Sequence, residues 1–158
     1  MALNYRFASE IDPDNPDDAR WIDYIIYCAT HPAPLSIFET NTAELRKSLN
    51  DKKISRKEFF ALLLENNYDG LLFTEKGINV GHVFWQVCNT DDGVVWKIFS
   101  WFVHDDFQGN GYGTEEIRCL LCTAHDRGIK SVILGDGNND KTMRVLQKIL
   151  MGGTQFAF

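Results

Sequence analysis

The sequence predicts a mixed α/β fold of the α+β kind, in which helices flank a mostly antiparallel sheet. Three apolar runs rich in β-branched and aromatic residues are joined by two short turns, the pattern of antiparallel hairpins. A helical pattern then separates the third run from the next, and a helical crossover joins parallel strands. With 158 residues, the chain is expected to form a single domain over residues 1–158.

The N-terminal part predicts one strand followed by helices. Residues 5–8 form the strand, and a turn at residues 13–18 offers N-cap side chains to a helix over 19–30. His31-Pro32-Ala33-Pro34 ends that helix, because proline cannot continue it. Residues 35–39 are predicted to be a loop.

Two more helices are predicted before the sheet, over residues 42–50 and 55–66. The second begins with Ser55 and carries Glu58 three residues later, the capping-box pattern. The strands of the meander are predicted at Gly70–Thr74, Val80–Val87 and Val94–Val103, with turns at Lys76-Gly77 and Asp91–Gly93. Trp85, Trp96 and Trp101 in these strands are expected in the core.

The C-terminal part predicts a helix, a parallel strand, a further helix and a short last strand. The first helix has apolar residues at i, i+3, i+4 and i+7, and Gly128 is placed to end it. The apolar residues are Ile117, Leu120, Leu121 and Ala124, and the later elements are predicted at Ser131–Leu134, 140–150 and Thr154–Phe158.

Composition excludes several classes of protein. The net charge of −6 opposes binding to nucleic acid, which favours a basic face. No run of about 18 apolar residues could cross a bilayer, and no signal-peptide pattern opens the chain. We therefore expect a cytoplasmic protein with neither a nucleic-acid nor a membrane partner.

Four cysteines leave a redox or zinc function to be considered. Cys119 and Cys122 have the C-x-x-C spacing, but they fall on and beside the apolar stripe of a predicted helix. No second Cys/His pair follows at zinc spacing. We predict buried free thiols at all four positions, which include Cys28 and Cys88, and no metal.

A glycine-rich turn, Gln108-Gly109-Asn110-Gly111-Tyr112-Gly113-Thr114, lies between a predicted strand and a predicted helix. The first N–H groups of a helix have no intrahelical partner and attract anions. Glycines allow positive φ and a close approach of phosphate oxygens to the backbone. Three alternating glycines are equally compatible with a tight connection that binds nothing.

Two familiar phosphate loops do not fit this turn. A P-loop requires Gly-Lys-Ser/Thr, whereas Gly113-Thr114 has no lysine. The dinucleotide fingerprint requires G-x-G-x-x-G after the first strand, whereas this chain has G-x-G-x-G after a late one.

A third pattern fits. Gln108, Gly111 and Gly113 match the Gln/Arg-x-x-Gly-x-Gly/Ala loop of the GNAT superfamily of N-acetyltransferases. The run 103–113 resembles that family's passage from its fourth strand into its third helix, with Asp105 where proline is common. The resemblance covers about residues 70–151 and implies a splayed pair of parallel strands at the cofactor site.

A second segment, residues 139–150, resembles the other coenzyme-proximal segment of that family. It is most similar to the branch that acetylates the N-termini of ribosomal proteins, with Gln147 in place of a glutamate within Arg144–Lys148. The resemblance implies acetyl-CoA as cosubstrate, with its pyrophosphate on the backbone N–H groups of residues 108–114. Its pantetheine arm would then lie along Phe102 and Val103 and contact Asn139.

Catalytic residues are less evident. The family's usual glutamate on the fourth strand is absent from Val94–Val103, and Leu146 stands where a tyrosine acid is often found. His104, His82 and Glu39 remain as candidates. Each has a structural alternative: His104 as a surface-turn residue, His82 as a core residue, and Glu39 as a solvated loop residue.

The resemblance predicts direct transfer of an acetyl group from acetyl-CoA to a primary amine of a small molecule or of a protein or peptide. The alternative is a catalytically silent module of the same fold that binds acyl-CoA or a partner protein. The single short strand at residues 154–158 also leaves a sheet edge that a homodimer would cover.

Overall fold

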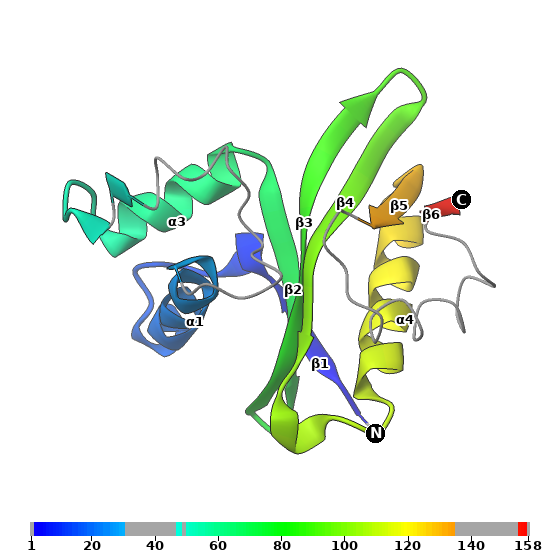
Figure 1. The fold of residues 1–158 in the computed structure, drawn as a ribbon, viewed down its shortest axis with the longest axis horizontal. Coiled ribbons are helices and arrows are strands. Elements are labelled where there is room, and N and C mark those ends of the chain that lie inside the picture. The colour runs from blue at the N-terminus through cyan, green and yellow to red at the C-terminus, as the bar shows by residue number, and fades with distance from the viewer. Residues whose placement is uncertain (1, 31–46, 49, 135–154, 158) are drawn as a thin grey trace.

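The described residues form a six-stranded sheet with helices on both faces (Figure 1). The computed structural model of the chain describes residues 2–30, 47–48, 50–134 and 155–157. The strands are β1 (Asn4–Phe7), β2 (Tyr68–Glu75), β3 (Ile78–Thr90), β4 (Gly93–Val103), β5 (Ser131–Leu134) and β6 (Gln155–Ala157), which lie in that order across the sheet. The helices are η1 (Ala8–Glu10), η2 (Pro16–Asp18), α1 (Ala19–Thr30), α3 (Arg56–Glu65), η4 (Asp105–Phe107) and α4 (Tyr112–Asp126).

The two faces of the sheet carry separate apolar clusters. On one face α1 and α3 pack over β2 and β3, through side chains that include Ile25, Phe59 and Leu72. On the other face α4 packs over β3, β4 and β5, through side chains that include Ile117, Leu120 and Val83. Trp85, Trp96 and Trp101 belong to the second cluster and are buried, as predicted.

Most pairings are antiparallel, as the sequence predicted. The β2–β3 and β3–β4 hairpins turn at Lys76-Gly77 and at residues 91–92. β4 and β5 are the parallel pair, from Val95 opposite Ser131 to Ile98 opposite Leu134. The predicted terminal strand is present as β6, which pairs antiparallel with β5.

Local sequence signals set the helix limits. α1 spans the predicted residues, and α3 begins after Ser55, whose hydroxyl accepts from the Glu58 N–H while the Glu58 carboxylate accepts from the Ser55 N–H. α4 ends before Gly128, which has a φ of 73°. The predicted helix at 140–150 lies outside the described residues, as does most of the one at 42–50.

The prediction of buried thiols is wrong, since none of the three cysteines whose side chains are described is fully buried. Cys122 is exposed, while Cys119 and Cys88 are half-buried and all three are free. Cys122 follows the apolar position Leu121 by one residue, so the 100° step per residue turns its side chain outward. Nothing is described of the Cys28 side chain.

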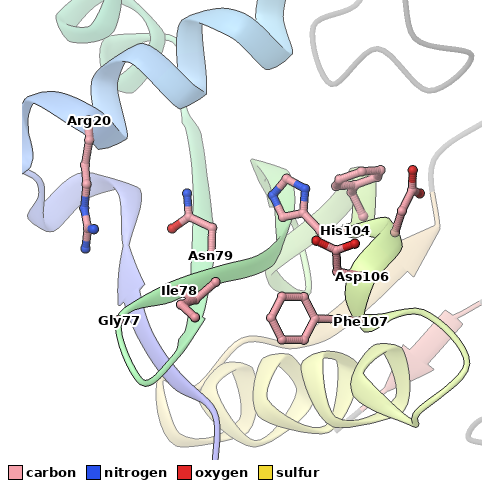
Figure 2. Close-up of a pocket in the computed structure, with 9 residues that line it drawn as sticks. Arg20, Gly77, Ile78, Asn79, His104, Asp106 and Phe107 are labelled. Carbon is pink, nitrogen blue, oxygen red and sulfur yellow. The ribbon is translucent and has the colours of Figure 1, made fainter.

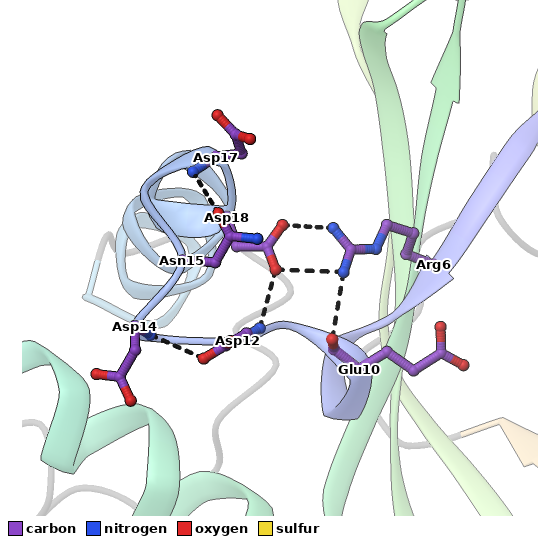
Figure 3. Close-up of polar contacts among 7 residues, drawn as sticks. All are labelled: Arg6, Glu10, Asp12, Asp14, Asn15, Asp17 and Asp18. Atoms are coloured by element: carbon purple, nitrogen blue, oxygen red, sulfur yellow. Dashed lines mark hydrogen bonds and ion pairs between the residues drawn. The ribbon is translucent and has the colours of Figure 1, made fainter.

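A part-buried ion pair holds the start of α1 against β1 (Figure 3). Asp18 is 4% exposed and accepts from both terminal nitrogens of Arg6, at 2.5 and 3.2 Å. Its second oxygen also accepts from the Asp12 N–H at 3.0 Å. Asn15 caps the turn by accepting from the Asp17 N–H at 3.0 Å. These bonds position α1, which carries Arg20 and Tyr24 toward the site.

Replacing Asp18 by asparagine should lower the free energy of unfolding at pH 7, because Arg6 loses its charged acceptor. The bonds from Arg6 and Asp12 hold the pKa of Asp18 below its ordinary value. A lowered folded pKa gives stability that is present above the ordinary aspartate pKa, about 3.9, and lost as the pH falls through the folded value. Urea unfolding across this range should therefore show the difference between wild type and Asp18→Asn shrinking on acidification.

Asp17→Asn is the matched control, because Asp17 is the exposed neighbour in the same turn. An equal loss of stability in both variants at pH 7 would show that the Arg6 pair contributes nothing specific.

Candidate functional site: the open edge of β4

The site begins at the part of β4 that follows its described pairing with β5. Their pairing ends at Ile98 and Leu134, whereas β4 continues to Val103. The β3–β4 register shifts at the same point, since Trp85 faces Ile98 and Phe84 faces Ser100, which leaves one extra residue in β4. Such a bulge bends and twists a strand. The last part of β4 is therefore unpaired by β5 in the described chain.

The register decides which backbone groups face this open edge. The His104 N–H donates to the Val80 carbonyl at 2.8 Å, across from β3. In an antiparallel ladder the bonding direction alternates from residue to residue. Phe102 therefore turns its backbone groups toward β3, whereas Trp101 and Val103 turn theirs toward the open edge. Consistent with this, the Val103 carbonyl accepts from the Gln108 side chain at 2.8 Å.

The glycine turn directly follows this edge and ends at the N-terminus of α4. Gly109 and Gly111 have φ values of 79° and 84°, which side-chain-bearing residues rarely adopt. Gly111 is the N-cap of α4 and supplies no side-chain acceptor to the first turn. A Cβ at Gly109 would meet nothing within 4 Å, so the space beside the turn is open.

Side-chain hydrogen bonds and one ring contact stabilise the glycine turn. Gln108 bonds to the Val103 carbonyl and, at 3.2 Å, to the Asp105 carboxylate. Asn110 donates to the Gln108 carbonyl at 3.2 Å. The Tyr112 ring packs on Phe107, and its hydroxyl donates to Glu75. The side chains of Gln108, Asn110 and Tyr112 are thus engaged by other protein groups, which leaves the backbone N–H groups of the first turn of α4 as the anion donors of the turn.

On the face of the sheet that lies opposite α4, β3 and β4 carry a cluster of aromatic rings. His82 is 3% exposed, and its Nδ1 lies 2.5 Å from the Tyr24 hydroxyl of α1. The Phe102 ring stacks on His82 at 5.7 Å between centroids and meets the His104 ring at 5.0 Å. Phe102 is 39% exposed, so this cluster reaches the surface beside the open edge.

The two histidines of this cluster are held neutral. Burial, with a smaller contribution from His104, lowers the pKa of His82 to about 3. Burial also lowers the pKa of His104, while Asp105 and Asp106 act to raise it. Both imidazoles are therefore uncharged at pH 7, and His104, which is half-buried, is the more accessible.

A cavity of about 570 Å³ opens beside His104 (Figure 2). Its lining combines the polar residues Asn79 and His104 with charged residues of both signs. The lining residues are Arg20, Gly77, Ile78, Asn79, Phe102, His104, Asp105, Asp106 and Phe107. They come from α1, the β2–β3 turn, the start of β3, the end of β4 and η4.

The structure thus brings His82, His104, Phe102 and the glycine turn together around the end of β4. Glu39 and Asn139 lie outside the described residues. Sequence reasoning missed Tyr24, which reaches His82 from 58 positions away, and Glu116, a carboxyl buried under β4. Glu116 could have been noticed as an acidic residue beside the apolar position Ile117 of α4.

The described residues include neither a metal-binding cluster nor a membrane-spanning helix. No group of three or more His, Cys, Asp or Glu side chains there could hold a metal ion. None of the described helices has the length and apolar character needed to cross a membrane.

Comparison with known proteins identifies the family. The family model described as "Acetyltransferase (GNAT) family" matches residues 35–150, well over half of the chain. None of the curated protein sequences compared with the chain matches it.

Several solved acetyltransferase structures share the fold. An aminoglycoside acetyltransferase from an uncultured soil metagenomic sample gives a TM-score of 0.60 at 12% identity, over 97% of this chain and 91% of its own. Glucosamine-6-phosphate N-acetyltransferase from Arabidopsis thaliana gives 0.60 at 13% identity, over 97% and 93%. A predicted acetyltransferase from Clostridium acetobutylicum, solved with acetyl-CoA, gives 0.56 at 16% identity, over 94% and 88%.

At these identities the structural similarity supports the fold alone, while the family model covers the glycine turn and the strand before it. The open edge of β4, the positive-φ glycines and the free first turn of α4 fit a ligand that carries a diphosphate and an amide-bearing arm. The chain therefore belongs to the GNAT family of acetyltransferases, whose acetyl donor is acetyl-CoA.

Proposed function

We propose that this protein transfers the acetyl group of acetyl-CoA directly to a primary amine, with His104 accepting the proton. The observation that carries this proposal is the position of His104, a half-buried neutral imidazole on the wall of the 570 Å³ cavity at the end of β4. A neutral imidazole at pH 7 is able to act as a general base.

In this proposal the donor lies along the open edge of β4. The backbone N–H groups of residues 109–114 hold the diphosphate, because they lie at the positive end of the α4 dipole, whereas the N–H of Gln108 donates to the Asp105 carbonyl. The amides of the pantetheine arm pair with the outward backbone groups of Trp101 and Val103. Phe102 contacts the arm with its ring, and Asn139 contacts it from the later segment.

The chemistry requires an uncharged amine. An alkylamine with a pKa of about 10.4 is neutral in only about one molecule in 2,500 at pH 7. That neutral form attacks the thioester carbonyl carbon, a C–N bond forms, and the C–S bond breaks to release the thiolate. The proton left on the nitrogen becomes acidic once the C–N bond has formed, and it passes to His104.

His82 and Tyr24 have a supporting role in this proposal. A fully buried histidine with a pKa of about 3 does not retain a proton at neutral pH. His82 instead holds Phe102 and Tyr24 in place by ring stacking and its bond to the Tyr24 hydroxyl.

The charges beside His104 favour a cationic acceptor. Asp105 and Asp106 are exposed and line the same cavity, so they attract an ammonium group before it loses its proton. Arg20, on the α1 side of the cavity, is placed to bind an anionic group elsewhere on the acceptor.

The acceptor class is open to a direct screen. Purified protein with acetyl-CoA would be assayed for thiol release against aminoglycosides, glucosamine 6-phosphate, polyamines and peptides with free N-termini. The first two are chosen because structures of the same fold carry those names, and the peptides because of the resemblance to the ribosomal-protein branch. Tight binding of coenzyme A with no turnover on any amine would favour the silent acyl-CoA-binding module, which the lack of a carboxylate in β4 motivates.

We further propose a homodimer through the C-terminal strand. β6 is the last strand in the sheet, and no described strand pairs with its outer edge. Pairing with a second copy would satisfy those backbone groups. Light scattering should give twice the 18.1 kDa chain mass, and a purely monomeric mass at assay concentration would exclude the dimer.

Gly111→Asp should raise the dissociation constant for coenzyme A at least about tenfold, because it places a negative charge against the diphosphate. The φ of 84° adds backbone strain, so Gly128→Asp, with a φ of 73° and open space around it, is the matched control at the other end of α4. Titration calorimetry would compare the two variants. Equal affinities in both would remove the proposed role of the turn.

His104→Gln should lower kcat by about a hundredfold or more, the usual contribution of a general base. Wild-type activity should fall as the pH drops through the His104 pKa, which lies below the ordinary value of about 6.5, because the protonated ring cannot accept a proton. The variant should lose this acid limb. His125→Gln, an exposed histidine of α4, serves as the control, and a wild-type rate in His104→Gln would refute the assignment.

A further inference from the structure

Glu116 is a fully buried carboxyl on the inner face of α4. It is 0% exposed and lies in the apolar stripe of the helix beside Ile117 and Leu120, which contact β3 and β4. Its Oε2 accepts from the Trp101 indole N–H at 3.0 Å. Its Oε1 has no hydrogen-bond partner among the described residues.

Burial of this group is unfavourable for the core. A carboxyl taken out of water stays protonated or loses stability, and burial raises the pKa of Glu116 well above its ordinary value. An apolar side chain would avoid the unpaired oxygen. The one described interaction that the carboxyl provides is the acceptor for Trp101.

Trp101 connects Glu116 to the glycine turn. It belongs to the part of β4 that no described residue of β5 pairs, and it is 9% exposed. A Cβ on Gly113 would lie 3.2 Å from Cζ2 of the indole, so the ring is in contact with the backbone of the first turn of α4. The indole is therefore packed directly beneath the N–H groups that the proposed function assigns to the diphosphate.

The other side of the carboxyl is closed by β3. A Cβ on Gly81 would lie 2.5 Å from Oε1 of Glu116 and 2.0 Å from the Phe102 carbonyl oxygen. Only glycine fits between β4 and the buried carboxyl at this point. Glu116 is thus confined between the backbone of β3 and the Trp101 ring, and its Oε2 fixes the position of the indole N–H.

We propose that Glu116 is a positioning residue for acetyl-CoA: its bond to the Trp101 N–H fixes the indole against Gly113 and so sets the first turn of α4 for the diphosphate. This inference rests on the proposed role of the glycine turn. Glu116 does not touch the reacting atoms, so its effect is expected on the binding of the donor more than on the chemical step.

The test compares three variants by calorimetric titration with coenzyme A at pH 7. Glu116→Leu and Trp101→Phe each break the bond, and each should weaken binding by about tenfold, the size expected for one lost buried hydrogen bond. Glu116→Gln keeps an acceptor oxygen of similar geometry and should bind within about twofold of wild type. Thermal unfolding without ligand confirms that each variant is folded.

The double variant Glu116→Leu/Trp101→Phe tests whether the two residues act through their common bond or have independent structural roles. If the two residues act through their common bond, the double variant should bind no more weakly than either single variant. Additive losses, or loss of thermal stability with unchanged affinity, would overturn the inference. If Glu116→Leu fails to fold, Trp101→Phe and Glu116→Gln still decide it.

Gly111→Asp distinguishes a failure of the proposed glycine-turn site from a failure of the positioning role of Glu116. If that variant binds coenzyme A as well as wild type does, the role of the turn itself fails. If it loses binding while the Glu116 and Trp101 variants keep theirs, the turn retains its role and the positioning by Glu116 is refuted.

Discussion

The rest of the site depends on the end of β4 beyond Ile98, which no described residue of β5 pairs. Continued pairing would satisfy the backbone groups of Trp101 and Val103 within the sheet and leave no edge for a ligand. The extra residue in β4 coincides with that point, and a bulge supplies the bend and twist that pairing would resist. The glycine turn then follows at once, so the open edge and the start of α4 form one continuous surface.

The two faces of β4 have different roles in the proposed site. The helix α4 and the second apolar cluster support the cofactor turn from one face through Trp101 and Gly113. The other face presents His82, Phe102 and His104 toward α1, whose position depends on the ion pair between Arg6 and Asp18. The strand β4 therefore lies between the residues that support the proposed donor turn and the surface proposed for the acceptor.

Elements with local signals were predictable from the sequence, and long-range contacts were not. The Ser55 capping box, the two hairpins and the Gly128 stop all act within a few residues, and each has the predicted form. The Tyr24–His82 bond and the Trp101–Glu116 bond depend on how α1 and α4 dock on the sheet, and no spacing encodes that. Cys122 was also mispredicted, because it follows the apolar position Leu121 by one residue and the helix turns its side chain outward.

Burial shifts the pKa values of both buried ionisable groups next to β4 toward their uncharged forms. Burial disfavours the charged form, so the pKa of His82 is lowered on one face and the pKa of Glu116 is raised on the other. The exposed charges, those of Asp105 and Asp106, lie beyond the strand in η4. An uncharged arm and thioester beside β4 thus lie between two groups whose charged forms are disfavoured, while the charged parts of the ligands meet the helix N-terminus and the cavity wall. A charge introduced at either buried position would act on the strand through a poorly solvated interior, where electrostatic effects are largest.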